Sequence, residues 1–253
     1  MIMIDRLMLV FLAAAATSAS PPPAAIESQA NIEVGDGTVS GTRLSPYANA
    51  WMFSLHLPGG QVRDRGIWSD VVRWREQDGR RLLERVQGMT YANGMSSVTI
   101  NRFDPATLAP VYSEQHTPAG RVIKRRFEGT HVETRDIRSP GAPESVRQFD
   151  TPVPVYDFNG GMYGLLLAAQ PLRIGYAGKL PAIGEFDDTY DTVPFKVVRR
   201  EKIGAGAKGE IDAWVVDVGA PTTMTFWIAE RPPYIIRLKT PEPQGDAVWD
   251  LIG

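Results

Sequence analysis

The acidic run GEFDDTYD is the densest group of side chains in the sequence that could carry out chemistry. It holds four carboxylates, at Glu185, Asp187, Asp188 and Asp191. Hard oxygen ligands at this density could hold Ca²⁺. The run lacks the fixed ligand order of an EF-hand loop and the glycine at its sixth position. We therefore predict a solvated acidic loop, and no metal site, at these residues.

The three histidines, His56, His116 and His131, fall on different predicted strands. His116 follows Glu114, and His131 precedes Glu133, in each case at the two-residue spacing that places both side chains on one face of a strand. A zinc site built from such a pair is an alternative. Because no two histidines stand at a metal-ligand spacing, we expect solvated polar positions on an outward strand face.

Motifs for covalent catalysis and cofactor binding are missing from the sequence. It contains no cysteine, which excludes thiol catalysis, disulfides and thiolate metal sites. The segment NGMSSV lacks the second glycine of a nucleophile elbow, and IGAGAKGE precedes a strand rather than a helix that could receive a phosphate. We predict no catalytic residue and no cofactor. A carboxylate pair assembled in space, as in glycoside hydrolases, stays open.

The basic segment RVIKRRF places charge on both faces of a predicted strand. Arg121 and Arg125 alternate with Lys124 and Arg126. This pattern is typical of an edge strand that avoids aggregation, and an anion-binding role is the alternative. The net charge of −2 indicates no attraction to nucleic acid, and 43% hydrophobic with 22% charged residues is typical of a globular protein.

Turn signals divide the first half of the chain into strands that alternate with period two. They are Gly59-Gly60, Asp78-Gly79, Asn93-Gly94 and the segment 118–120. We predict positive φ angles at Asp78-Gly79 and Asn93-Gly94, because both pairs favour type I′ hairpins. Successive hairpins of this kind predict an antiparallel meander.

The segment FNGGMYGLLLAAQP interrupts the β pattern. Asn159 can serve as an N-cap, the residues from Met162 to Ala169 are mostly good helix formers, and Pro171 ends the segment. After it the strands resume, with poor alternation in FKVVRREKI that indicates a bulge, and a break at Pro232-Pro233. We predict a mainly β fold, a single curled antiparallel sheet or open barrel-like meander with one short helix.

Three segments carry a resemblance to a known family: YDFNGGMYGLLLAAQPLRIGYAGKLPA, VRREKIGAGAKGEIDAWVVDV and TFWIAERPPYIIRL. Together with a looser match in the first half, they resemble family 3108 of the domains of unknown function over most of residues 45–240. The resemblance implies an exported bacterial protein with a curled antiparallel sheet similar to the lipoprotein-carrier and lipocalin-like group. It implies no activity and no site residue.

The N-terminus reads as a secretory signal peptide over residues 1–19, because one arginine precedes a short apolar run and small residues follow. An uncleaved anchor is the alternative. We predict a flexible linker over 20–35, a β domain over 36–253, and a periplasmic or secreted location. No later segment is long enough to span a membrane.

The helical segment also defines the candidate ligand site. Its apolar residues could simply fill the concave side of the sheet, or they could gate a cavity for a lipid-like ligand. The predicted pocket residues are Trp51, Phe53, Met162, Leu165, Leu166, Trp214 and Trp227. We predict a non-catalytic exported protein that binds an apolar small molecule or lipid. The alternatives are an envelope hydrolase that uses spatially assembled carboxylates and a scaffold for a partner protein.

Overall fold

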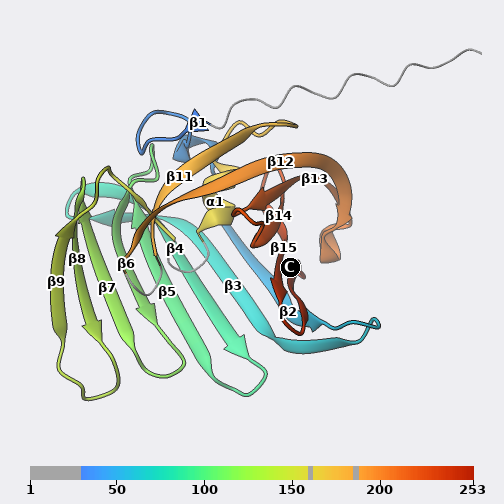
Figure 1. Cartoon of the computed structure of the whole chain (residues 1–253), viewed down its shortest axis with the longest axis horizontal. Coiled ribbons are helices and arrows are strands. Elements are labelled where there is room, and N and C mark those ends of the chain that lie inside the picture. Colours follow the sequence, from blue (N-terminus) through green and yellow to red (C-terminus); the bar gives the residue numbers. More distant parts are fainter. Residues whose placement is uncertain (1–29, 159–161, 185–187) are drawn as a thin grey trace, which may run out of the picture.

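The structure is a computed structural model that describes residues 30–158, 162–184 and 188–253. One curled, mainly antiparallel sheet makes up most of the molecule (Figure 1). Its hydrogen-bonded order is β1-β11-β12-β13-β14-β15-β16-β2-β3-β4-β5-β6-β7-β8-β9, and β10 also pairs with β11. The predicted fold class is confirmed. The predicted signal segment lies outside the described residues, as do residues 20–29 of the predicted linker. Residues 30–31 pair with β11, and Ile32 is buried.

Strands β2 to β9 of the first half follow one another along the chain and in space, whereas β1 pairs with β11 of the second half. Their bounds are β1 Ala30–Asn31, β2 Tyr47–His56, β3 Val62–Gln77, β4 Arg80–Tyr91, β5 Ser96–Phe103, β6 Pro110–His116, β7 Val122–Glu128, β8 His131–Ile137 and β9 Ser145–Asp150. A 3₁₀ turn, Gly41–Arg43, precedes β2. This part of the chain forms the predicted meander.

The second half curls over the first and encloses the helix (Figure 1). Its elements are β10 Tyr156–Asp157, α1 Tyr163–Ala168, β11 Ala177–Ile183, β12 Tyr190–Gly204, the 3₁₀ turn Gly206–Lys208, β13 Glu210–Val218, β14 Met224–Ile228, β15 Ile235–Glu242 and β16 Gly245–Leu251. β16 pairs with β2 and joins the two halves. Among the described residues, no strand pairing joins β9 to β10 or β11, so the sheet stays open.

The hairpin turns agree with the turn chemistry of the sequence at all but one residue. Asp78 and Gly79 both have positive φ, at 51° and 71°, which confirms the predicted type I′ geometry. Gly94 has a φ of 81°, but Asn93 is not among the residues with positive φ. The prediction for Asn93 was wrong because the loop has three residues, 92–94, closed by the Gly94 N–H donating to the Tyr91 carbonyl at 2.9 Å.

Two features of the later strands confirm predictions, and one earlier strand corrects a prediction. The register of β12 shifts between Val197 and Arg199, where a bulge was expected. Pro232 and Pro233 lie between β14 and β15. The segment RVIKRRF, however, is β7, which lies between β6 and β8 and is not an edge strand. Its charges lie on both faces because both faces carry ion pairs.

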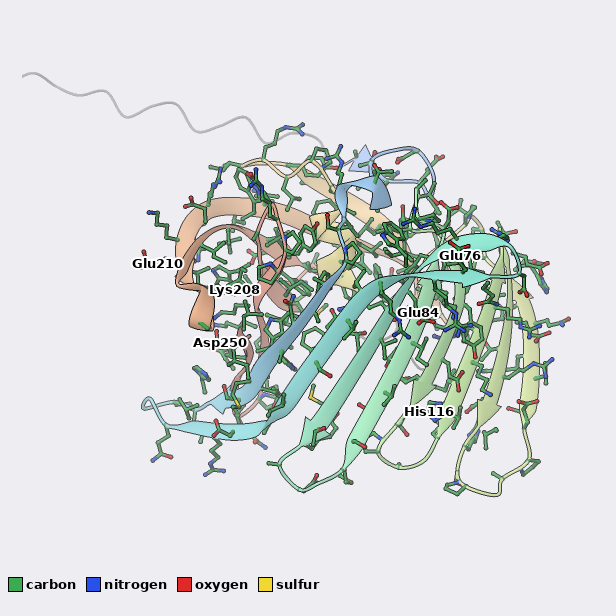
Figure 2. The ribbon with its side chains drawn as sticks, turned by 180° about the vertical axis from the view of Figure 1, so that it is seen from behind. Glu76, Glu84, His116, Lys208, Glu210 and Asp250 are labelled. Carbon is green, nitrogen blue, oxygen red and sulfur yellow. The ribbon has the colours of Figure 1, made fainter. Side chains whose placement is uncertain are left out.

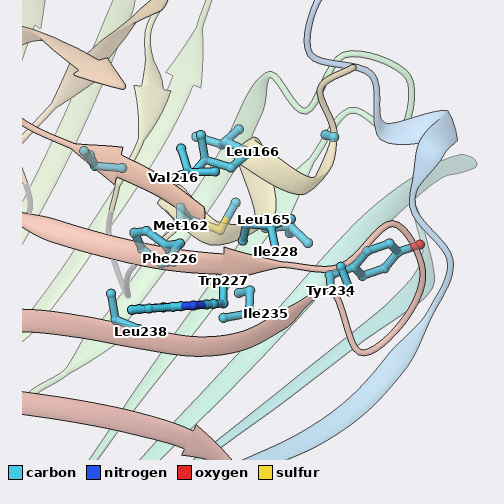
Figure 3. Close-up of a cluster of buried hydrophobic side chains, with 14 of the residues drawn as sticks. Met162, Leu165, Leu166, Val216, Phe226, Trp227, Ile228, Tyr234, Ile235 and Leu238 are labelled. Atoms are coloured by element: carbon cyan, nitrogen blue, oxygen red, sulfur yellow. The ribbon is translucent and has the colours of Figure 1, made fainter. Parts of the chain in front are cut away.

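The helix α1 lies on the concave side of β14 and β15 (Figure 3). Its N-cap is Met162; the predicted N-cap Asn159 lies outside the described residues. Gly164 permits the close approach, because an added Cβ would stand 2.5 Å from Ile235 Cδ1 and 3.1 Å from Phe226 Cε1. Leu165, Leu166 and Leu167 are all buried. The helix therefore fills the curve of the sheet.

No helix in the described part of the chain combines the length and the apolarity that crossing a membrane would require.

Candidate functional site

The interior around α1 is densely filled with apolar side chains. Of the predicted pocket residues, Trp51, Met162 and Leu165 are fully buried, and Leu166 is 1% exposed. Trp51 packs against Trp68 at 4.7 Å between ring centroids, and its Nε1 donates to the Ile235 carbonyl at 3.1 Å. The structure thus brings these four residues into one core, together with Phe226 and its neighbours (Figure 3).

The other three predicted pocket residues lie away from the helix face. Phe53 stacks on Trp249 at 4.4 Å. Trp214 is half-buried under the Arg200 guanidinium. Trp227 alternates along β14 with Phe226, which faces the helix, and its Nε1 donates to Glu201 at 2.6 Å. Trp214 and Trp227 therefore contact charged side chains, although Trp227 belongs to the same buried apolar cluster as Met162 and Trp214 packs against that cluster.

An open groove of about 540 Å³ lies beside the first residue of α1. Tyr163 of α1 lies at its base, and its walls are residues of β11, β12 and the β13–β14 turn: Lys179, Asp191, Thr192, Val193, Pro194, Gly219, Ala220, Pro221 and Thr223. The turn is held against β12 by the Gly219 N–H, which donates to the Pro194 carbonyl at 2.8 Å. Backbone and side chains from three elements thus shape this groove.

Tyr163 connects the groove to the apolar core. Its ring stacks on Phe158 at 3.8 Å and lies 6.5 Å from Phe226. Lys179 is half-buried in the groove wall and makes no ion pair among the described residues. Asp191 is exposed, and its carboxylate accepts the Thr192 N–H at 2.7 Å. The groove therefore combines an aromatic base, walls of mixed apolar and polar residues, and one cation.

A buried polar surface, which we call the inner polar face, covers the concave side of β4–β8. Its first row consists of directly paired residues, each at most 1% exposed: Arg85, Asn101, Ser113, Arg125 and Thr134. A second row, Gln87, Thr99 and Gln115, runs beside it. Ser113 Oγ and Gln87 Oε1 have no hydrogen-bond partner among the described residues. Polar groups are rarely buried in such numbers unless they are bonded to one another or to water.

Arg85 anchors one end of the inner polar face. Its guanidinium binds Asp70 at 2.7 Å, and its Nη1 lies 3.0 Å from Met162 Sδ at the start of α1. Tyr47 donates its hydroxyl to Asp70 at 2.8 Å. Burial, together with the nearby Asp70 charge, raises the pKa of Tyr47 well above its usual value. Tyr47 therefore remains a hydrogen-bond donor at physiological pH.

Arg125 anchors the other end and bonds to carboxylates from outside the meander. Its Nε lies 2.9 Å from Asp188, which follows β11, and its Nη1 lies 3.6 Å from Asp157 on β10. Asp188 also accepts the Thr134 hydroxyl at 3.0 Å and pairs with Arg147 on β9 at 2.5 Å. The expectation of a solvated acidic loop is wrong for Asp188, because an inward arginine draws it against the sheet.

The outer face of the same strands carries a second charge network (Figure 2). Arg73, Arg75 and Arg102 all bond to Glu84, whose side chain is 2% exposed. Burial raises the pKa of Glu84, but the hydrogen bonds from Arg73 and Arg102 outweigh it and leave the pKa below its usual value. Glu84 therefore stays ionised, and its bonds to the three arginines connect β3, β4 and β5.

The histidines and the acidic residues form no metal centre in the described part of the chain. His116 bonds to Glu114 at 2.7 Å, and His131 bonds to Asp150 at 3.0 Å; both histidines are partly exposed. They occupy the predicted polar positions on the outer strand face. Glu185 and Asp187 of the acidic run lie outside the described residues.

Sequence reasoning missed the inner polar face. The available signal was a polar residue recurring at alternate positions on neighbouring strands, such as Thr99 and Asn101 on β5 or Ser113 and Gln115 on β6. A polar alternation on strands is normally read as the solvent side. Only the curl of the second half over these strands turns it into an interior.

The comparisons with known proteins yield one match. A family model described as "Protein of unknown function (DUF3108)" matches residues 84–251, well over half of the chain. No curated protein and no solved structure matches the chain.

Proposed function

The chain belongs to the DUF3108 family of proteins of unknown function, and we propose that it is a non-catalytic, exported protein that binds a lipid-like amphiphile in the groove beside α1. The groove itself carries this proposal. Its volume of about 540 Å³ lies within the range of small-molecule sites, and its lining combines apolar side chains such as Val193 and Pro194 with polar ones such as Lys179, which suits a ligand that has both an apolar and a polar part.

The filled interior supports the groove, rather than the space beneath the helix, as the ligand site. Met162 and Leu165 are fully buried, which favours the helix as filler over the helix as gate. Tyr163, the next residue after the N-cap, is the one that lines the groove. An apolar chain lying against Tyr163, Val193 and Pro194 would extend the apolar core outward.

Lys179 supports an amphiphile over a purely apolar ligand. Lys179 is half-buried and makes no ion pair among the described residues, so its ammonium could pair with an anionic headgroup bound in the groove. The alternative of a hydrolase gains no comparable support. The buried carboxylates Asp70, Asp157 and Asp188 all bond to arginines, which stabilise their charged form in ion pairs.

Titration of the full-length protein with dansyl-undecanoic acid tests the proposal. We expect saturable binding that Tyr163→Ala weakens and that Thr192→Trp, which fills the groove, abolishes. Tyr91→Ala is the matched control, because Tyr91 is equally half-buried but lies at the β4–β5 hairpin. Absence of saturable binding to the wild type, or equal loss in Tyr91→Ala, would contradict the groove as the site.

The exported location rests on the N-terminal sequence. We expect removal of the residues up to about 19 on export, because a short apolar run is followed by small residues. Intact-mass measurement of the protein recovered from the periplasm or medium checks this expectation. A full-length product retained in the membrane would contradict it.

A further inference from the structure

Two parts of the curled sheet come together along a seam. Among the described residues, side-chain contacts rather than paired strands join these two parts. The seam lies between β7–β9 on one side and β10, β11 and Asp188 on the other. A small apolar cluster of Phe127, Val132, Val155 and Ile183, with Phe149 against it, is separate from the main core and spans this seam. The other contacts across the seam are made mainly by charged side chains.

Four residues, which we call the clasp, hold the seam electrostatically: Arg125, Arg147, Asp157 and Asp188. Asp188 is their shared centre, because it bonds both to Arg125 Nε at 2.9 Å and to Arg147 Nη2 at 2.5 Å. Asp157 adds a second link to Arg125 at 3.6 Å and accepts from the Asn101 amide at 3.3 Å. The Arg125 and Asp157 side chains are fully buried, whereas Arg147 is 48% exposed.

We propose that the seam is a gate in the fold, held shut by the clasp and opening independently of the apolar core. This inference does not depend on ligand binding in the groove. Opening the sheet at α1 would expose large apolar side chains to water, which is strongly unfavourable. Opening it at the seam exposes only the small cluster around Val132 and Ile183, together with polar residues such as Ser113 and the clasp, whose polar groups regain hydrogen bonds to water.

The composition of the inner polar face fits this role. A face that was always closed would gain more from apolar packing than from buried ion pairs, whose desolvation cost offsets their attraction. In a face that is alternately closed and wet, groups such as Ser113 Oγ and Gln87 Oε1, which have no partner among the described residues when closed, gain hydrogen bonds to water when the seam opens. The half-exposed arm Arg147–Asp188 is the point where solvent ions can reach the clasp and compete with it.

Hydrogen–deuterium exchange of the full-length protein tests the gate. We expect peptides from β8, β9 and β10 to exchange faster than those from β13–β15, by subglobal opening. Asp188→Asn should accelerate exchange at the seam by about tenfold or more, because Arg147 and Arg125 both lose their bond to the shared carboxylate and Arg125 is left with the longer contact to Asp157. Arg147→Gln, which removes only the exposed arm, should accelerate it by about two- to fivefold. Peptides from β13–β15 should be unchanged in both variants.

Glu84→Gln is the matched control, since Glu84 is also a buried carboxylate bonded to several arginines but lies on the outer face. It should leave the ratio of seam exchange to β13–β15 exchange unchanged. Equal acceleration of both regions by Asp188→Asn and by Arg147→Gln would overturn the gate and make the clasp a global stabiliser. Unchanged seam exchange in both variants would overturn the clasp.

Discussion

The two halves of this sheet bury opposite kinds of side chains on the same concave side. In the strands that surround α1, the interior is aliphatic and aromatic, with Leu165 and Phe226 at its centre. In β4–β8, the interior is a grid of amides, hydroxyls and ion pairs centred on Arg85 and Arg125. The apolar interior around α1 is what selection for stability alone would produce. The polar interior of β4–β8 costs free energy of folding unless its side chains serve a purpose.

The largest expected effect comes from the polar half. Asp70→Asn should lower the free energy of unfolding by about 3–5 kcal/mol, because Arg85 is fully buried and loses its charge partner. The double variant Asp70→Leu with Arg85→Met should recover most of this loss, since apolar residues of similar size remove both charges. Chemical denaturation measures both. A double variant as unstable as the single one would show that the polar face is required for stability, and would break the comparison.

In the apolar half, Leu166→Ala should lower the free energy of unfolding by about 2–5 kcal/mol, as a cavity forms beneath α1. Ile174→Ala is its control; Ile174 is 58% exposed, so the change should stay within about 0.5 kcal/mol. Thermal and denaturant unfolding of the wild type, Leu166→Ala and Ile174→Ala measures both changes in the free energy of unfolding. A small effect of Leu166→Ala together with a fatty-acid-dependent rise in melting temperature would identify the helix as a gate rather than as filler.

The ion pairs of Glu84 should make the free energy of unfolding depend on pH, which separates the contribution of charge from that of packing. Its pKa lies below the usual value of 4.5, so its stabilising contribution is fully present above that pH and is lost as the pH falls through the lower, folded-state pKa. Glu84→Gln should therefore cost about 1.5–3 kcal/mol at pH 7, and the difference from the wild type should shrink below about pH 4.5. Urea melts across this pH range measure it. A difference that is independent of pH would mean that packing, not charge, makes the contribution.

The smallest expected effect concerns two glycines, Gly79 in a hairpin turn of the first half and Gly204 at the end of β12 in the second half. Gly79→Val should cost about 1 kcal/mol or more, because the φ angle of 71° is strained for a β-branched residue although nothing stands within 4 Å of an added Cβ. Gly204, at the end of β12, has equally open space and no positive φ. Gly204→Val should thus be close to neutral. Coincident thermal melts of wild type and Gly79→Val would contradict the assigned turn geometry.

The sequence by itself determined the local features of this protein. Period-two alternation and turn pairs such as Asp78-Gly79 predicted the meander, and the apolar spacing from Met162 to Ala169 predicted the single helix. Such features depend on residues close together in the chain, so a local pattern is enough to specify them. Pro232-Pro233 and the bulge in β12 could be placed for the same reason.

Only the tertiary structure decided which polar side chains are interior. Arg125 and Asp188 are 63 positions apart, and the alternation of RVIKRRF is compatible with an edge strand as well as with a buried one. Strand alternation defines two faces but does not say which face is later covered. In the folded protein the second half covers the first and brings the carboxylates of Asp157 in β10 and of Asp188, between β11 and β12, against Arg125 of β7. The groove arose in the same way, because Tyr163, Val193 and Pro221 meet only when α1, β12 and the β13–β14 turn are packed together.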